Sequence, residues 1–210
     1  MSEVANILLK IQAVTLNPAK PYTFISGLKS PIYCDNRLLI SYPDLRTKII
    51  DEFINLIHKH SLAFDVVGGT ATAGIPHAAW VADRLKKPMI YIRGKSKDHG
   101  KKNQIEGKLE KGQTVLVIED LVSTGGSSVS AVEAVREAGG VVHACCAIFT
   151  YEFEQAKKKF ADTECKLFTL TTFSELLTTA TEQKFITPEE ETIAREWNKD
   201  PERWGERFAK

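Results

Sequence analysis

Two adjacent carboxylates followed by small polar residues are the part of this 210-residue chain best suited to chemistry. Glu119 and Asp120 end the apolar run VLVI, and the segment LVSTGGSS follows before a helical stretch begins. In an open α/β sheet, ligands bind beyond the carboxyl ends of the strands. The N–H groups at a helix N-terminus bind phosphate, and small residues let a phosphate approach closely.

This arrangement predicts a site for a sugar that carries a phosphate. Carboxylates at a strand end suit the hydroxyl groups of a ribose, or a bound magnesium ion, better than they suit a phosphate. Four hydroxyl groups add hydrogen-bond donors for the phosphate, those of Ser123, Thr124, Ser127 and Ser128. The alternative interpretation is a helix that these residues merely cap.

A second glycine-rich turn, GGTATAGIP at residues 68–76, also lies between an apolar run and a helical stretch. It is not a nucleotide-binding P-loop, because Ile75 stands where that motif requires lysine. We expect the turn, with Thr70 and Ala71, to bind a second phosphate group through its backbone. A tight strand-to-helix connection without a ligand is the alternative.

The segment 93–107 carries an excess of cations over acids. Arg93 ends an apolar run and is expected at the same sheet edge as the two acids, and Gly94, Gly100 and Gly107 provide hinges. A cationic loop that closes over a pyrophosphate would neutralise the charge that develops as this group leaves. A solvated, charged surface loop remains the alternative.

The pattern of apolar runs and helical stretches predicts the elements that position these residues. Uninterrupted apolar runs are typical of parallel strands that are covered on both faces, and their alternation with helical stretches predicts a doubly wound α/β fold. The expected strands lie at 64–68, 89–92, 115–118, 141–149 and 167–170, and the expected helices between them at 74–86, 126–138 and 152–161.

The N-terminal part follows a different pattern. Residues 2–16 are predicted to form one helix, and residues 21–40 a small subdomain of short strands and turns. Ser41 is expected to cap a second helix with Pro43 in its first turn. The buried stripe of that helix is expected to comprise Ile49, Ile50, Phe53, Ile54 and Ile57.

Composition and charge exclude several classes of protein. The net charge of +1 does not indicate a nucleic-acid partner, and the apolar runs are too short to cross a bilayer. The four cysteines lack the spacing of a zinc site, so we expect reduced thiols and a cytoplasmic location without a membrane partner. Cys34 as a catalytic nucleophile lacks a nearby base in the sequence.

Four segments resemble known phosphoribosyltransferases. IEDLVSTGGSS resembles the phosphoribosyl-pyrophosphate signature of the type I enzymes. The segments SGLKSPIYCDNR, GTATAGIP and RGKSKDHGKKNQIEG, in this order and spacing, are similar to the orotate phosphoribosyltransferase family over about residues 20 to 150. The resemblance implies the type I phosphoribosyltransferase fold, a mostly parallel sheet flanked by helices, with a small N-terminal hood and a mobile catalytic loop.

With this fold, we expect residues 1–210 to form a single domain. The N-terminal helix and hood would occupy about residues 1–40, and the core about residues 41–172. A helical tail would occupy about residues 173–210, with Trp197 and Trp204 as its anchors.

The resemblance also implies an activity in pyrimidine (UMP) biosynthesis. Members transfer ribose 5-phosphate from phosphoribosyl pyrophosphate to orotate, with Mg²⁺ as cofactor, and give orotidine 5'-phosphate and pyrophosphate. Magnesium would be held mainly by substrate and water, with Asp120 as the candidate protein ligand. The loop at 93–107 would reach into the partner subunit's site, which implies a homodimer.

Matching positions give the implied site residues. The implied catalytic residues are Arg93, Lys97 and His99, at the pyrophosphate, and Asp120. Glu119 and Asp120 would bind the ribose, and Tyr33 and Cys34 would flank the base. The 5'-phosphate segment comprises Leu121, Val122, Ser123, Thr124, Gly125, Gly126 and Ser127, of which Ser123 also matches a position that contacts orotate.

This chain departs from the family pattern at three places. Gly94 follows Arg93 where many members have lysine, so Lys95 is expected to take that role. Ile25 stands before the SG pair where some members have lysine. The segment FTYEFEQ lacks the arginine that binds the orotate carboxylate, and we expect Arg37 or Lys29 to replace it. Two rival functions remain: transfer to another nucleobase, and a non-catalytic sensor of phosphoribosyl pyrophosphate.

Overall fold

A six-stranded sheet forms the centre of the protein in the computed structural model, which describes residues 2–24, 27–94 and 104–208. The strand order is β10-β9-β8-β5-β6-β7, and all pairs are parallel except β6 with β7. The strands are β5 (Val66–Thr70), β6 (Met89–Ile92), β7 (Ile105–Glu106), β8 (Thr114–Val122), β9 (Val141–Thr150) and β10 (Lys166–Thr172). The predicted α/β class with a parallel sheet is confirmed, and each expected strand is present.

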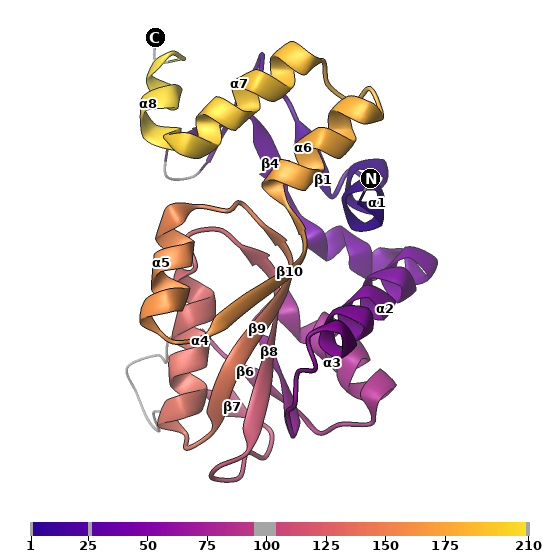
Figure 1. The fold of residues 1–210 in the computed structure, drawn as a ribbon, viewed down its shortest axis with the longest axis vertical. Coiled ribbons are helices and arrows are strands. Elements are labelled where there is room, and N and C mark those ends of the chain that lie inside the picture. Colours follow the sequence, from indigo (N-terminus) through magenta and orange to yellow (C-terminus); the bar gives the residue numbers. More distant parts are fainter. Residues whose placement is uncertain (1, 25–26, 95–103, 209–210) are drawn as a thin grey trace.

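Helices cover both faces of this sheet (Figure 1). On one face lie α2 (Pro43–Lys59) and α3 (Gly74–Leu85), and on the other lie α4 (Gly126–Glu137) and α5 (Glu154–Asp162). Residues of β8 alternate between the two buried clusters, because neighbouring side chains on a strand point to opposite faces. The strands are therefore buried on both sides, which explains their uninterrupted apolar sequences.

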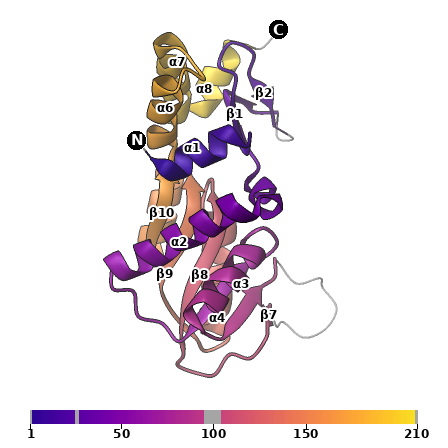
Figure 2. The ribbon, with the colours of Figure 1, turned by 90° about the vertical axis from the view of Figure 1, so that its right-hand side faces the viewer.

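The two ends of the chain meet above the carboxyl ends of the strands (Figures 1 and 2). The N-terminal end contributes α1 (Glu3–Lys10), β1 (Val14–Leu16), β2 (Tyr22–Thr23), β3 (Lys29–Ser30), β4 (Ile32–Cys34) and the 3-10 helix η1 (Asn36–Ser41). We call residues 14–41 the hood. The C-terminal end contributes α6 (Phe173–Glu182), α7 (Pro188–Lys199) and α8 (Pro201–Glu206), which we call the tail.

Two N-terminal predictions are wrong. The first helix ends at Lys10 instead of residue 16, because Gln12 adopts a positive φ of 58° and the chain reverses. Val14–Leu16 then pairs antiparallel with β4. Ser41 does not cap α2, because it ends η1. Tyr42 precedes the helix instead, and Pro43 occupies its first turn as expected.

Trp197 and Trp204 anchor the tail as predicted, since their exposed fractions are 0% and 2%. The tail packs on the N-terminal end of the chain, with α6 against α1 and α8 against β3. In the part of the chain that the structure describes, no helix is long and apolar enough to cross a membrane.

Candidate functional site

The carboxylate of Glu119 joins the two phosphate-binding turns expected from the sequence. Glu119 is the last of five consecutive buried residues in β8 and is 6% exposed. Its Oε1 accepts a hydrogen bond from the Thr70 hydroxyl at 2.6 Å, and its Oε2 accepts one from the Ser128 hydroxyl at 3.0 Å. Thr70 ends β5 before the first turn, and Ser128 lies in the first turn of α4. Both turns therefore lie beside the acids at the carboxyl edge of the sheet.

Burial sets the electrostatics of the acid pair. Loss of solvation raises the pKa of Glu119, and the neighbouring Asp120 carboxylate adds to this, while the Thr70 hydrogen bond opposes it. Burial also raises the pKa of Asp120, against the effect of hydrogen bonds and of Arg37. Two neighbouring carboxylates with raised pKa values favour ligands that donate hydrogen bonds, such as the hydroxyl groups of a ribose.

The turn after β8 leaves the start of α4 open to a ligand. Gly125 takes the N-cap position with a positive φ of 77°, and among the described residues no side chain caps this helix. The side chains of Thr124 and Ser127 are exposed and that of Ser123 is half-buried. The first-turn N–H groups and these hydroxyls can therefore surround a phosphate.

Two residues of the predicted 5'-phosphate segment have side chains that pack in the core. Val122 is fully buried, and its carbonyl accepts a hydrogen bond from the Tyr151 N–H. Leu121 packs partly buried against the opposite cluster. Both residues belong to β8, which continues through Val122 before the turn begins, so their part in a phosphate site would be played by the backbone.

A cavity of about 420 Å³ lies between the two turns and the end of β6. Its walls include Thr70, Ala71, Arg93, Gly126 and Ser127. The Ala71 N–H already donates to the Ile92 carbonyl at 2.8 Å. This N–H is therefore used within the sheet and is not available to a ligand. The peptide bond between Ala71 and Thr72 is cis.

Arg93 brings positive charge to this cavity. Its side chain is 50% exposed and pairs with Glu106 of β7, with 3.2 Å between Nε and Oε1. Gly94 follows Arg93 in the cavity wall. Lys95, Lys97 and His99 lie outside the described residues, so their predicted roles rest on the sequence.

The hood contacts the acid pair through Asn36, which the sequence analysis missed. Asn36 is 1% exposed, and its Nδ2 donates to the Asp120 carbonyl at 2.8 Å. Its Oδ1 accepts a hydrogen bond from the thiol of Cys34 at 3.4 Å. No periodic pattern marks Asn36, and its only signal is its position directly after the segment YCD.

The residues expected at the base lie on or beside β4. Tyr33 is 44% exposed, and its ring lies near that of Tyr22, with 5.9 Å between centroids. Burial and the carboxylates of Asp120 and Asp35 raise the pKa of the Cys34 thiol far above its usual range. These surroundings favour the protonated thiol and argue against Cys34 as a nucleophile.

The two candidate partners of a ligand carboxylate differ in their contacts. The guanidinium of Arg37 forms two hydrogen bonds with the Asp35 carboxylate, at 2.6 Å and 2.8 Å. The ammonium of Lys29 donates to the neutral hydroxyl of Thr23 at 2.8 Å. A ligand carboxylate would thus have to compete with Asp35 for Arg37, but only with a hydroxyl for Lys29.

The acid pair fits a magnesium ion that is held mainly by a ligand and water. Among the described residues, no group of three or more histidines, cysteines or acids lies where it could hold a metal ion. Both Glu119 oxygens already accept hydrogen bonds, so Asp120 is the carboxylate left to contact the ion. Magnesium sites of this kind use one or two carboxylates together with substrate phosphates.

Comparisons with known proteins agree with this geometry. Residues 43–176 match the model of the phosphoribosyl transferase domain family. The chain is 54% identical to an orotate phosphoribosyltransferase of Coxiella burnetii over 203 residues, which cover 97% of each chain. A crystal structure of orotate phosphoribosyltransferase from Aeropyrum pernix is similar at a TM-score of 0.77 and 29% identity, over 85% of this chain and 98% of that one. A UMP synthase structure from Leishmania donovani is similar at a TM-score of 0.80 and 28% identity, over 94% of this chain and 42% of that one.

Proposed function

This chain belongs to the phosphoribosyl transferase domain family, among its orotate phosphoribosyltransferases, and from that membership we propose how its own residues carry out the reaction. The reaction transfers ribose 5-phosphate from phosphoribosyl pyrophosphate to orotate and releases pyrophosphate. The observation that carries the proposal is the contact of Thr70 and Ser128 with Glu119, since it brings a turn for each phosphorylated end of the donor beside the ribose acids.

We assign the 5'-phosphate to the turn Ser123–Ser127 and the pyrophosphate to the cavity beside Arg93. Glu119 and Asp120 would accept hydrogen bonds from the ribose hydroxyls. The cavity volume of about 420 Å³ lies at the lower end of the range of small-molecule sites. Arg93 would exchange part of its interaction with Glu106 for the pyrophosphate.

In the proposed mechanism, the bond between C1' and the pyrophosphate oxygen weakens before the weakly nucleophilic orotate attacks. Positive charge then grows on the ribose ring, where the carboxylate of Asp120 stabilises it. Arg93 and Lys97 stabilise the leaving pyrophosphate, and His99 donates a hydrogen bond or a proton to it. Asp120 would help to hold a magnesium ion, which would supply further positive charge to the pyrophosphate oxygens.

We propose that the base binds against the hood, between Tyr33, Cys34 and the acid pair. The hydrogen bond from Asn36 to the Asp120 carbonyl supports this placement, because it links η1 directly to the ribose end of the site. Orotate would then reach C1' from the hood side, opposite the cavity that receives pyrophosphate.

The function is tested by the loss of orotate absorbance when the protein is mixed with phosphoribosyl pyrophosphate and Mg²⁺. We expect orotidine 5'-phosphate to form, and pyrophosphate release with adenine, xanthine or uracil to be much slower. Faster release with another base would favour the first rival function. Donor binding without any product would favour a sensor of phosphoribosyl pyrophosphate.

We propose that Lys29 binds the orotate carboxylate, because its ammonium has only a hydroxyl partner among the described residues. A charge-assisted hydrogen bond contributes about 1.5–3 kcal/mol. Lys29→Met should therefore raise KM for orotate more than tenfold and leave KM for phosphoribosyl pyrophosphate unchanged. Arg37→Met is the matched variant, and a larger effect of Arg37→Met on KM for orotate would assign the carboxylate to Arg37.

We further propose a homodimer in the cytoplasm, with the loop at 93–107 shared between subunits. The exposed side chains of Leu38 and Tyr42, 40% and 43% accessible, supply apolar surface beside the hood that a second subunit would cover. All four cysteines are free thiols, which supports a reducing compartment.

A further inference from the structure

A hydrogen bond ties the tail to the hood strand that carries Lys29. The indole N–H of Trp197, in α7, donates to the Lys29 carbonyl at 2.9 Å. Trp197 is fully buried. The bond joins residues 168 positions apart, so it fixes one end of the chain to the other.

The same indole contacts the segment that follows β9. Its ring lies 5.8 Å from that of Tyr151 and 5.4 Å from that of Phe153, measured between centroids. The next residue, Asn198, donates to the Tyr151 carbonyl. This is the segment in which the arginine expected for the orotate carboxylate is missing, so α7 occupies the region beside it.

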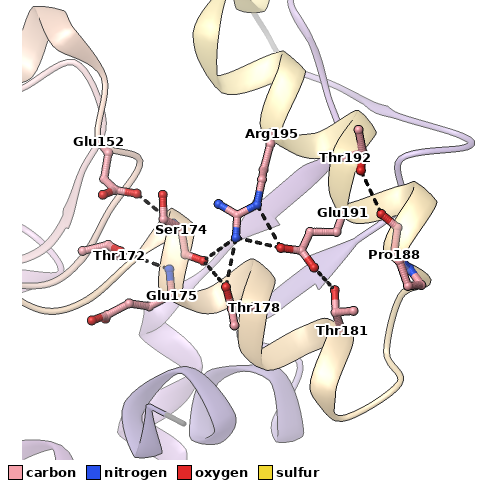
Figure 3. A network of polar contacts seen from close by, with 10 residues as sticks. All are labelled: Glu152, Thr172, Ser174, Glu175, Thr178, Thr181, Pro188, Glu191, Thr192 and Arg195. Carbon is pink, nitrogen blue, oxygen red and sulfur yellow. Dashed lines mark hydrogen bonds and ion pairs between the residues drawn. The ribbon is translucent and has the colours of Figure 1, made fainter.

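A network of polar contacts holds α7 rigidly on α6 (Figure 3). Arg195 donates to the Ser174 carbonyl, to the Thr178 hydroxyl and to the Glu191 carboxylate, at 3.2, 2.9 and 2.7 Å. Glu152, from the segment after β9, accepts a hydrogen bond from the Ser174 N–H at 2.7 Å. These contacts hold the tail against the core independently of the contact between Trp197 and the hood.

The tail also borders the proposed site. A cavity of about 570 Å³ is lined by Leu28 of the hood, Thr124 of the 5'-phosphate turn, Phe153, and Asn198 of α7. A shift of α7 would move the wall of this cavity and the strand β3 together.

We propose that Trp197 is a positioning residue for the base end of the site, which holds β3 so that Lys29 faces orotate. This inference rests on the proposed function for its effect on orotate, but its structural part does not. Trp197 does not touch the substrate, and it acts through the backbone of Lys29.

The test is Trp197→Phe, which keeps an aromatic ring in the cluster but removes the indole N–H. Loss of one intramolecular hydrogen bond corresponds to about a three- to tenfold change in an equilibrium constant. We expect KM for orotate to rise by about this factor, while kcat and KM for phosphoribosyl pyrophosphate stay within about twofold of wild type. Amide hydrogen exchange in residues 28–34 should become faster.

Trp204→Phe is the matched control. Trp204 is also buried in the tail, and its helix α8 also packs on β3, but its indole N–H donates to the Ile193 carbonyl of α7 at 3.1 Å and not to the hood. We expect a similar loss of thermal stability in this variant, with no change in KM for orotate or in hood exchange.

The outcomes separate this inference from the proposed function. Wild-type protein that forms no orotidine 5'-phosphate would contradict the proposed function, and the exchange data would still test the hood contact. Unchanged exchange in Trp197→Phe, or equal increases in KM for orotate in both tryptophan variants, would overturn the inference. Equal changes in both KM values of Trp197→Phe would also overturn it.

Discussion

At the residue scale, Glu119 organises the site in addition to its proposed contact with the ribose. Its two oxygens already accept hydrogen bonds from Thr70 and Ser128, and Oε1 also accepts one from the Asp120 N–H at 3.1 Å. A carboxylate with these contacts fixes the positions of the two turns and of Asp120 relative to one another. Asp120 is half-buried where Glu119 is buried, so Asp120 is the acid more open to the proposed ribose.

His77 leads to a prediction about pH and stability. This residue of α3 is 1% exposed, and neither ring nitrogen has a hydrogen-bond partner within the described residues. Burial, and then the positive charge of Arg46, lowers the pKa of His77 to about 4 from an ordinary 6.5. Between these values the unfolded chain binds a proton that the folded protein does not, so the free energy of unfolding falls as pH decreases from about 7 to 4.

The variant His77→Leu should lose less stability over that range. The difference of about 2.5 pKa units corresponds to about 3 kcal/mol. Because the imidazole has no hydrogen-bond partner to lose among the described residues, and leucine can also pack against Trp80, the variant should be close to wild type at pH 8. Urea unfolding at pH 8, 5.5 and 4.5 would measure this, with the titration of Glu119 common to both proteins. Parallel stability curves would show that His77 does not titrate as its burial implies.

At the element scale, the turn before α4 depends on Gly125. Its φ of 77° disfavours any side chain, and a Cβ atom there would lie 3.2 Å from the Cα of Ala156 in α5. Gly125→Ala should therefore lower the free energy of unfolding by about 1–2 kcal/mol because of the left-handed conformation. Displacement of the turn from α5 should lower it further. We expect a lower Tm and a higher KM for phosphoribosyl pyrophosphate.

Gly112→Ala is the control for this prediction. Gly112 has a similar φ of 86°, but nothing lies within 4 Å of the position of its Cβ. This variant should show only the conformational cost and an unchanged KM. Equal stability losses in the two variants, with unchanged KM in both, would mean that the contact with α5 does not fix the turn.

The elements themselves were predictable where a local pattern determines them. Uninterrupted apolar runs such as VLVI identify the buried strands, and the small residues after Asp120 identify the start of α4. The residue at which α1 ends was not predictable from the sequence. Val14 and Leu16 continue a helical spacing, but pairing with β4 makes them a strand. The buried side chains of Leu121 and Val122 likewise depend on how far β8 extends.

At the scale of the whole molecule, the contacts that complete the site join distant parts of the chain. Asn36 contacts Asp120, and Trp197 contacts Lys29, across 84 and 168 positions. Periodicity predicts that Trp197 is buried, but not which backbone group its indole meets. For this reason the sequence could predict that the two turns and the acids lie together, while the connection between hood, tail and core required the structure.

The proposed sharing of the loop between subunits can be tested with two inactive variants. Lys97→Ala should lower turnover at least tenfold, about 1.4 kcal/mol of barrier, and Asp120→Asn should impair the ribose end of the same reaction. If each loop serves the partner's site in a symmetric dimer, a mixed dimer has one site with both substitutions and one with neither. Random reassembly of equal amounts makes half of the dimers mixed, so about a quarter of wild-type activity should return on mixing.

If each loop serves its own subunit, every site in the mixture carries one substitution and no activity returns. Kinetics of the mixture after denaturation and refolding, with each variant refolded alone as control, would therefore decide whether the site of this protein is built from one chain or from two.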